Sequence, residues 1–201
     1  MEPKKKLHIS FNAPGVLVFA GICLVATVLG MISNGFLTQE FFMTYHSSLL
    51  NPLTYVRFFT HVFGHSGWGH FVSNMAFILL LGPMLEEKYG AKFLWEVIAV
   101  TAVATGVFSY IVFPNIALCG ASGVVFAFIL LASFTDFTEG EIPLTFLLVA
   151  LIYLGEQIIT GLTVQDDIAN FAHNIGGNIG KIFGYYMNKR AVSKEKRTGN
   201  I

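Results

Sequence analysis

The sequence predicts an all-α polytopic membrane protein whose helices form a single bundle. Hydrophobic residues make up 54% of the 201 residues and charged residues only 12%, whereas soluble domains contain about 25% charged residues. Between the charged positions lie apolar stretches near the ~20 residues that cross a ~30 Å hydrocarbon core as a helix. Because lipid offers no hydrogen-bond partner to the backbone, such stretches have to be helical.

Six apolar stretches predict six transmembrane helices, and Gly or Pro marks most of the connections between them. The predicted spans are Ala13–Met31, His70–Leu85, Phe93–Phe113, Ser122–Phe134, Leu144–Ile159 and Ile168–Met187. The long connection at 32–69 mixes Phe and Leu with polar residues, so we expect a folded, partly membrane-embedded interfacial loop. We interpret residues 1–201 as one domain, with a membrane core at about 13–187 and short basic tails.

The positions of Lys and Arg predict the direction of the spans. An even number of spans places both termini on one side, and every Lys and Arg except Arg57 falls toward that side. By the positive-inside rule both termini are cytoplasmic. We therefore expect an integral membrane protein, with the plasma membrane of a prokaryote as its location.

Polar residues inside three of the predicted spans are predicted to lie at a common depth. His70 and Asn74 are four residues apart near the start of the second span, so they share one helix face. Ser122 opens the fourth span, and His173 lies early in the sixth. These three spans run in the same direction, so the four side chains converge just below the outer surface. Polar residues within a span are costly and are functional candidates by default.

A serine beside a histidine indicates nucleophilic catalysis, because the hydroxyl is a poor nucleophile until a base takes its proton. His70, Asn74 and the backbone N–H of Ser122 are candidate donors to a developing oxyanion. No acidic residue is placed to orient His173, so the pair is a dyad. Phe126, one turn after Ser122, is placed to stack on the imidazole.

Several short motifs together resemble those of the rhomboid family of intramembrane serine proteases. They follow in the family's order and spacing, from about Arg57 to Gly184: Arg57-Phe-Phe-Thr-His61-Val-Phe-Gly-His65, His70-Phe-Val-Ser-Asn74, Glu86 with Gly90, Gly120-Ala-Ser122-Gly123, and Ala172-His173-Asn-Ile-Gly176 followed by Gly180. The family often has Trp where this chain has Val56, and Tyr where it has Phe126. The first departure is expected to loosen the loop, and the second keeps the ring stack.

The resemblance implies a role for each matching residue. Ser122 is the expected nucleophile and His173 the base, while His70, Asn74 and the Ser122 amide form the oxyanion hole. The expected supporting residues are Gly120, Gly123, Phe126 and Gly176. Family members cleave transmembrane segments of other proteins in the bilayer, without metal, nucleotide or other cofactor, and nucleic acid is not expected as a partner.

Each motif also has a structural interpretation. Gly120-Ala121-Ser122-Gly123 is a small-residue patch of the kind that lets helices pack closely. His173 and Asn74 are both compatible with structural hydrogen bonds. His61 and His65 are four apart like half of a metal site, but Val62 stands where a zinc protease has its glutamate. We interpret both as scaffolding residues of the loop.

Three other functions are alternatives to proteolysis. A catalytically silent rhomboid-like scaffold that binds transmembrane segments typically loses the serine or the histidine, and this chain has both. Glu86 and Glu87 suggest a glutamate-type membrane protease, but that family expects arginine where Ala91 stands. A transporter predicts broken helices in paired halves, and the sequence has no such symmetry.

Overall fold

The structure, a computed structural model, describes residues 12–135, 144, 148, 151 and 175–186. In this part of the chain almost all regular structure is helical. The helices are α1 (Pro14–Ile32), α2 (Phe36–Phe41), α3 (Pro52–Thr60), α4 (Trp68–Tyr89), α5 (Ala91–Val112), α6 (Ser122–Thr135) and a further helical segment at 175–186. The described residues add one isolated antiparallel bridge between Thr44 and Leu118. The predicted all-α fold is confirmed.

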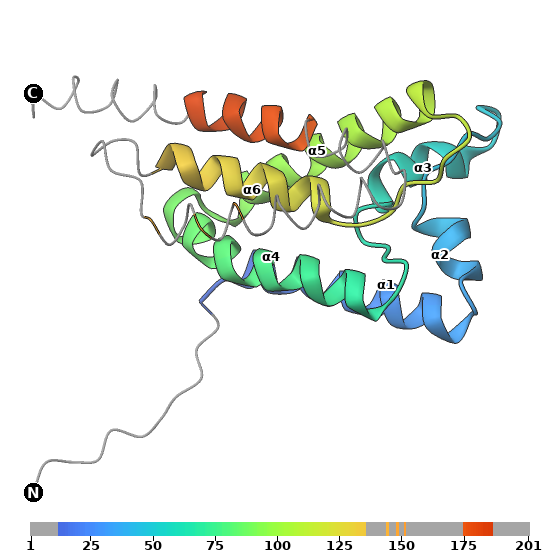
Figure 1. The fold of residues 1–201 in the computed structure, drawn as a ribbon, viewed down its shortest axis with the longest axis horizontal. Helices are drawn as coiled ribbons and strands as arrows, with labels where there is room; N and C mark the ends of the chain where they lie inside the picture. Colours follow the sequence, from blue (N-terminus) through green and yellow to red (C-terminus); the bar gives the residue numbers. More distant parts are fainter. Residues whose placement is uncertain (1–11, 136–143, 145–147, 149–150, 152–174, 187–201) are drawn as a thin grey trace, which may run out of the picture.

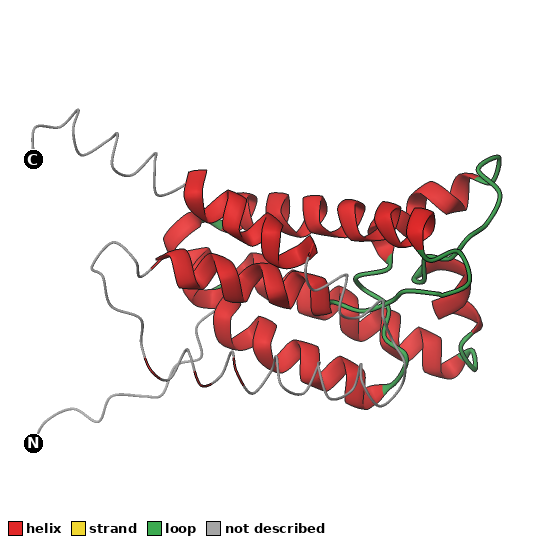
Figure 2. Cartoon of the chain, turned by 45° about the horizontal axis from the view of Figure 1, so that its top comes forward, coloured by secondary structure: helices red, strands yellow, loops and turns green. Residues whose placement is uncertain are grey.

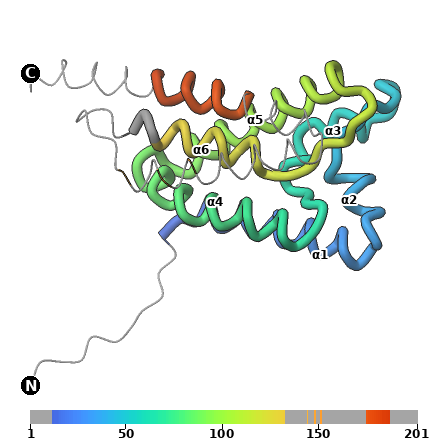
Figure 3. The backbone as a smooth tube through the Cα atoms, viewed as in Figure 1, coloured from blue at the N-terminus to red at the C-terminus, as the bar shows by residue number. Residues whose placement is uncertain are grey.

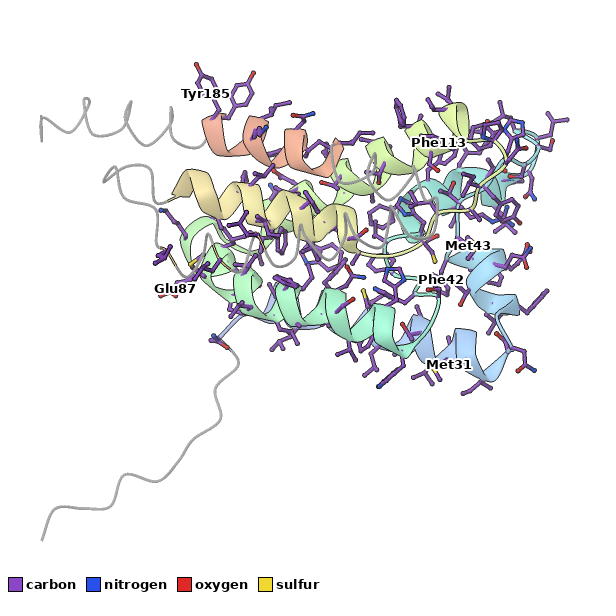
Figure 4. The ribbon with its side chains drawn as sticks, in the orientation of Figure 1. Met31, Phe42, Met43, Glu87, Phe113 and Tyr185 are labelled. Atoms are coloured by element: carbon purple, nitrogen blue, oxygen red, sulfur yellow. The ribbon has the colours of Figure 1, made fainter. Side chains whose placement is uncertain are left out.

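The long helices lie side by side along the bundle, and the two short helices α2 and α3 sit at one end of it (Figure 1). The loops of the described chain gather at that same end (Figure 2). We call it the loop end, formed by residues 33–67 and by the segment between α5 and α6. The side chains of Met31, Phe42, Met43 and Phe113 lie toward the loop end, whereas Glu87 and Tyr185 lie at the opposite end (Figure 4).

Three of the predicted spans correspond to helices long and apolar enough to cross a membrane: α1, α4 and α5. The fourth predicted span is the shorter apolar helix α6, which begins at Ser122 as expected. Leu144, Leu148 and Leu151 of the fifth predicted span are helical. The rest of that span lies outside the described residues, as does the sixth span before residue 175, including His173.

Helix α4 extends beyond the predicted His70–Leu85 at both ends, and its additional C-terminal part contains a buried carboxylate. Glu86, one residue beyond the predicted end, is buried, and its two carboxylate oxygens accept the backbone N–H groups of Gly15 at 2.9 Å and Val16 at 2.8 Å. Those N–H groups belong to the first turn of α1 and have no intrahelical partner. The helix ends only at Gly90, where φ is +84°.

The core of the bundle is apolar, and so are the surfaces that face away from it. Phe19, Ile78, Leu94 and Phe128, from α1, α4, α5 and α6, are fully buried together. Large apolar side chains such as Val18, Leu80 and Val103 are exposed on the same helices. Helices that are apolar all round are typical of a membrane bundle. The backbone path in Figure 3 shows α6 alongside α4, with which it is in contact.

Arg57 holds α2 and α3 together at the loop end. Its side chain is 2% exposed. Nε donates to the Glu40 carbonyl at 2.7 Å and Nη2 to the Glu40 carboxylate at 3.1 Å, while the guanidinium lies 4.5 Å from the centre of the Tyr45 ring. The neighbouring Val56, which departs from the family pattern, is exposed. The expected loosening of the loop at Val56 therefore does not extend to Arg57.

Candidate active site

Ser122 is the first residue of α6 and is half-buried. The two residues before it form a turn in which Gly120 has φ +124°, a conformation that strongly favours glycine. The helical hydrogen bonds begin here, with the Val125 N–H donating to the Ala121 carbonyl at 2.9 Å. The first N–H groups of a helix have no partner within it, and the amide of Ser122 is one of these groups in α6.

The loop at 33–67 fixes the turn that precedes Ser122. Gly120 donates its backbone N–H to the His61 carbonyl at 2.9 Å. Two residues earlier, Leu118 and Thr44 exchange backbone hydrogen bonds at 2.8 and 2.9 Å. Neither contact was expected, because backbone bonds between distant segments leave no residue pattern in the sequence. The loop is therefore part of the scaffold of the site as well as a feature of the membrane interface.

His70 lies directly against this turn. A methyl group placed on Gly120 would lie 2.6 Å from both Nε2 and Cε1 of the His70 imidazole. The ring therefore occupies the space in which any side chain at position 120 would have to fit. The first turn of α4 therefore contacts Gly120, which precedes Ser122 by two residues. This contact agrees with the prediction that His70 and Ser122 lie at a common depth.

Asn74 lies one helical turn after His70, and its side chain is 1% exposed. Its Nδ2 donates to the His70 carbonyl at 2.9 Å, within α4. This bond fixes the orientation of the amide on the face of α4 that also presents His70. An amide nitrogen has two hydrogens, so the bond to His70 uses one donor of the group.

The helical segment at 175–186 packs on α6 through small residues. A methyl group on Gly176 would collide with the carbonyl oxygen of Gly123, and one on Gly180 would collide with the carbonyl of Ala127. The matched spacing, four residues on each helix, shows that the two helices run in the same direction. Phe126 lies 3.9 Å from the corresponding position of Gly177. Backbones this close are typical of small-residue packing in membranes.

His61 and His65 bind the backbone of the loop end. The Nε2 of His61 is 3.0 Å from the Ala102 carbonyl, so it donates to α5. The Nδ1 of His65 is 3.2 Å from the Phe63 carbonyl. Burial lowers the pKa of His61 to about 4 and that of His65 to about 3, the latter helped by repulsion from His70. Both are therefore neutral near pH 7, in the scaffolding positions that we expected.

Of the sequence-predicted residues, the structure brings His70, Asn74, Gly120, Ser122, Gly123 and Gly176 to one region near the loop end. Glu86 lies toward the other end of α4, next to Glu87, and its carboxylate is occupied by the first turn of α1. This placement removes Glu86 from consideration as the acid of a glutamate-type membrane protease.

These observations define a polytopic α-helical membrane protein with a polar site near one end of the bundle. A family profile described as a rhomboid domain matches residues 52–190. The chain belongs to the rhomboid family, and it is an integral membrane protein.

The chain is also similar to two proteins whose names refer to rhomboids. Rhomboid-like protein 11, chloroplastic, of Arabidopsis thaliana is 38% identical over 71 residues, which cover 35% of this chain and 25% of that protein. Rhomboid-related protein 1 of Caenorhabditis elegans is 29% identical over 143 residues, which cover 65% of this chain and 39% of that protein. The chain thus matches well under half of the length of either relative.

Proposed function

We propose that this protein is an intramembrane serine endopeptidase that cleaves transmembrane segments of other membrane proteins in the bilayer. The observation that most supports the proposal is the contact of the His70 imidazole with Gly120, two residues before Ser122. A small-residue patch that served only for helix packing has no need of an imidazole on its turn. The arrangement suits a hydroxyl nucleophile with hydrogen-bond donors beside it.

In the proposed reaction, Ser122 attacks the carbonyl carbon of a substrate peptide bond, and His173 accepts the proton from its Oγ. His173 stands three residues before Gly176, and Gly176 packs on the residue next to Ser122. Three residues correspond to about one turn of a helix, so this spacing in the sequence supports His173 as the partner of Ser122. The base is assigned on this spacing and on the chemistry of the Ser–His pair.

The tetrahedral intermediate bears a negative oxygen that needs donors fixed in advance. We assign this role to the Ser122 amide, to His70 and to Asn74. When the intermediate collapses, the carbon–nitrogen bond breaks and His173 returns its proton to the leaving amine. Water then attacks the acyl-enzyme, giving up a proton to His173, and the serine leaves with that proton. Gly120, Gly123, Phe126 and Gly176 hold the geometry, and no metal or other cofactor takes part.

We also propose that both termini are cytoplasmic. Lys88 and Lys92 lie around the turn between α4 and α5, at the same end as Glu87 and Tyr185 (Figure 4). Arg57 lies at the loop end. This distribution supports an outward-facing loop end by the positive-inside rule. The two similar proteins come from a plant and a nematode, so the prokaryotic plasma membrane stays a prediction. Reporter fusions at the C-terminus test the orientation.

The direct test is the reaction of the purified, detergent-solubilised protein with a fluorescent fluorophosphonate. We expect labelling of the wild-type chain and none of Ser122→Ala, together with cleavage of a model transmembrane substrate by the wild type alone. An unlabelled, inactive wild-type protein that still binds transmembrane segments would indicate the catalytically silent scaffold instead.

A further inference from the structure

The two ring nitrogens of His70 have different surroundings. Nε2 and Cε1 face Gly120, each 2.6 Å from where a methyl group on that residue would stand, whereas Nδ1 is 3.8 Å from the same point. On the other side of the ring, Nδ1 is 3.1 Å from the Oγ of Ser66. One nitrogen thus faces the turn before the nucleophile, and the other faces a hydroxyl.

A neutral imidazole has a single N–H, and the bond made by one nitrogen selects the role of the other. To donate to an oxyanion at Ser122, His70 has to have its hydrogen on Nε2, which leaves Nδ1 as an acceptor. The Ser66 hydroxyl can donate to Nδ1 only in that neutral form.

We propose that Ser66 is a positioning residue that holds His70 as the Nε2–H tautomer. The choice of this tautomer rests on the proposed function, in which Nε2 donates to the oxyanion, whereas the contact between Ser66 and the His70 ring does not depend on that function.

The start of α4 explains why this serine hydroxyl is available for the ring. Serines just before a helix usually accept a hydrogen bond from its first N–H groups. Here the cap residue is Gly67, with φ 173°, and no side chain caps α4. Ser66 stands one residue earlier, and its Oγ is hydrogen-bonded to His70. In the sequence, Ser66 stands four residues before His70, and the glycine that begins the helix, Gly67, lies between them.

The surroundings of His70 also limit rotation of its ring. The His65 ring meets it nearly edge-on, with centroids 5.1 Å apart and planes inclined by 73°. His65 in turn uses Nδ1 on the Phe63 carbonyl at 3.2 Å, with Thr27 Oγ1 3.4 Å away. A ring flip of His70 would place a carbon against Ser66 and remove the hydrogen bond. Ser66 and His65 together favour one orientation of the His70 ring, in which Nδ1 faces the Ser66 hydroxyl.

The test uses the full-length protein labelled with ¹⁵N at histidine and reconstituted in lipid nanodiscs. Nitrogen chemical shifts distinguish the two neutral tautomers, and the His70 signals are assigned by their loss in His70→Gln. In the wild type we expect a protonated Nε2 and a bare Nδ1. In Ser66→Ala we expect a mixture of tautomers or exchange broadening at His70, and Ser66→Thr, which keeps the hydroxyl, restores the wild-type shifts.

Cleavage kinetics give the second readout. Loss of one neutral hydrogen bond corresponds to roughly a three- to tenfold effect, so kcat in Ser66→Ala should fall by about that factor while KM stays the same. Ser66→Thr should recover most of the rate. Ser73→Ala is the matched control, because Ser73 Oγ binds the backbone carbonyl of His70 at 3.1 Å and leaves the ring alone.

Two results would overturn the proposal: a wild-type His70 protonated at Nδ1, or Ser66→Ala shifts identical to those of the wild type. If the wild-type protein does not cleave substrate but Ser66→Ala changes the tautomer, the positioning role stands and only the protease function fails. The two hypotheses are thereby separated.

Discussion

At the loop end of the bundle, buried polar side chains bind backbone groups, whereas the described residues of the opposite end combine apolar packing with the buried carboxylate of Glu86. Arg57, His61 and Asn74 are all nearly inaccessible and bind carbonyl oxygens. At the other end Leu85 and Leu94 are buried, and Glu86 is the buried charged side chain that binds a helix start. Hydrogen bonds specify one conformation, while apolar burial is not directional. Substitutions of the site residues at the loop end should therefore lower activity, whereas substitution of Glu86 at the opposite end should lower stability.

The largest effect is expected for the nucleophile. Ser122→Ala should lower the rate of cleavage of a model transmembrane substrate by at least about 10⁴-fold, because removal of the attacking group disables the dyad as a unit. Its thermal midpoint should match that of the wild type, since only a half-buried hydroxyl is removed. Normal proteolysis by clean Ser122→Ala protein would rule out the proposed mechanism.

The oxyanion donors come next. Loss of one such donor typically costs about a hundred- to a thousandfold in rate, so His70→Ala and Asn74→Ala should each retain weak activity above that of Ser122→Ala. The decrease should appear in kcat measured with a substrate of known KM. Unchanged kinetics in both variants would show that the two residues are structural.

Gly120→Ala tests the contact between the turn and His70. An alanine there combines a strained φ of +124° with a Cβ at 2.6 Å from the imidazole, so the ring has to move. We expect about a hundredfold loss of kcat, of the order produced by displacing a catalytic group by about 1 Å. Gly21→Ala, in α1 and with no atom within 4 Å of the new methyl group, should retain full activity.

At the opposite end, Glu86→Gln should reduce stability with little effect on rate. A neutral amide has one acceptor oxygen in place of two charged ones, and it presents a donor toward a second backbone N–H. We expect a loss of about 2 kcal/mol, seen as a lower midpoint for thermal exposure of the buried Cys23 to a thiol-reactive dye. The exposed neighbour provides the control, because Glu87→Gln should change neither quantity. A large kcat effect of Glu86→Gln would break the contrast between the two ends.

The smallest expected effect is the loss of stability at acidic pH through protonation of His61. Burial lowers the pKa of His61 to about 4 from the ordinary 6.5, so the unfolded chain binds the proton more readily than the native one. Stability from neutral His61 is present above pH 6.5 and is lost as the pH falls toward 4. Between pH 7 and 5.5 this loss is about 1 kcal/mol. His61→Gln should be less stable at pH 7 but less sensitive to this pH change. An equal sensitivity in both proteins would contradict the assignment.

Most of the fold was predictable because a lipid environment makes apolar length a direct measure of a spanning helix. The start of α6 at Ser122 followed from the start of an apolar stretch. The shared face of His70 and Asn74 followed from their spacing of four residues in a helix. The full length of α4 did not, since the partner of Glu86 is the backbone of α1, 71 residues away from it at Gly15. The contact of His70 with Gly120 was also hidden, because it depends on one positive φ and on how two helices meet.

The bond from Gly120 to the His61 carbonyl, with the bridge between Leu118 and Thr44, has a consequence for biosynthesis. Chains fold from the N-terminus as they are made, so the acceptor segment around Thr44 and His61 reaches the membrane well before its partners do. The segment around Thr44 and His61 thus serves as a template: its backbone groups are in place to bind Leu118 and Gly120 when the turn before Ser122 forms. A ribosome stalled before Gly176 would leave the template and Ser122 in place without the helix that packs on Gly123. The proposed peptidase activity should therefore appear only after the C-terminal part of the chain has been inserted.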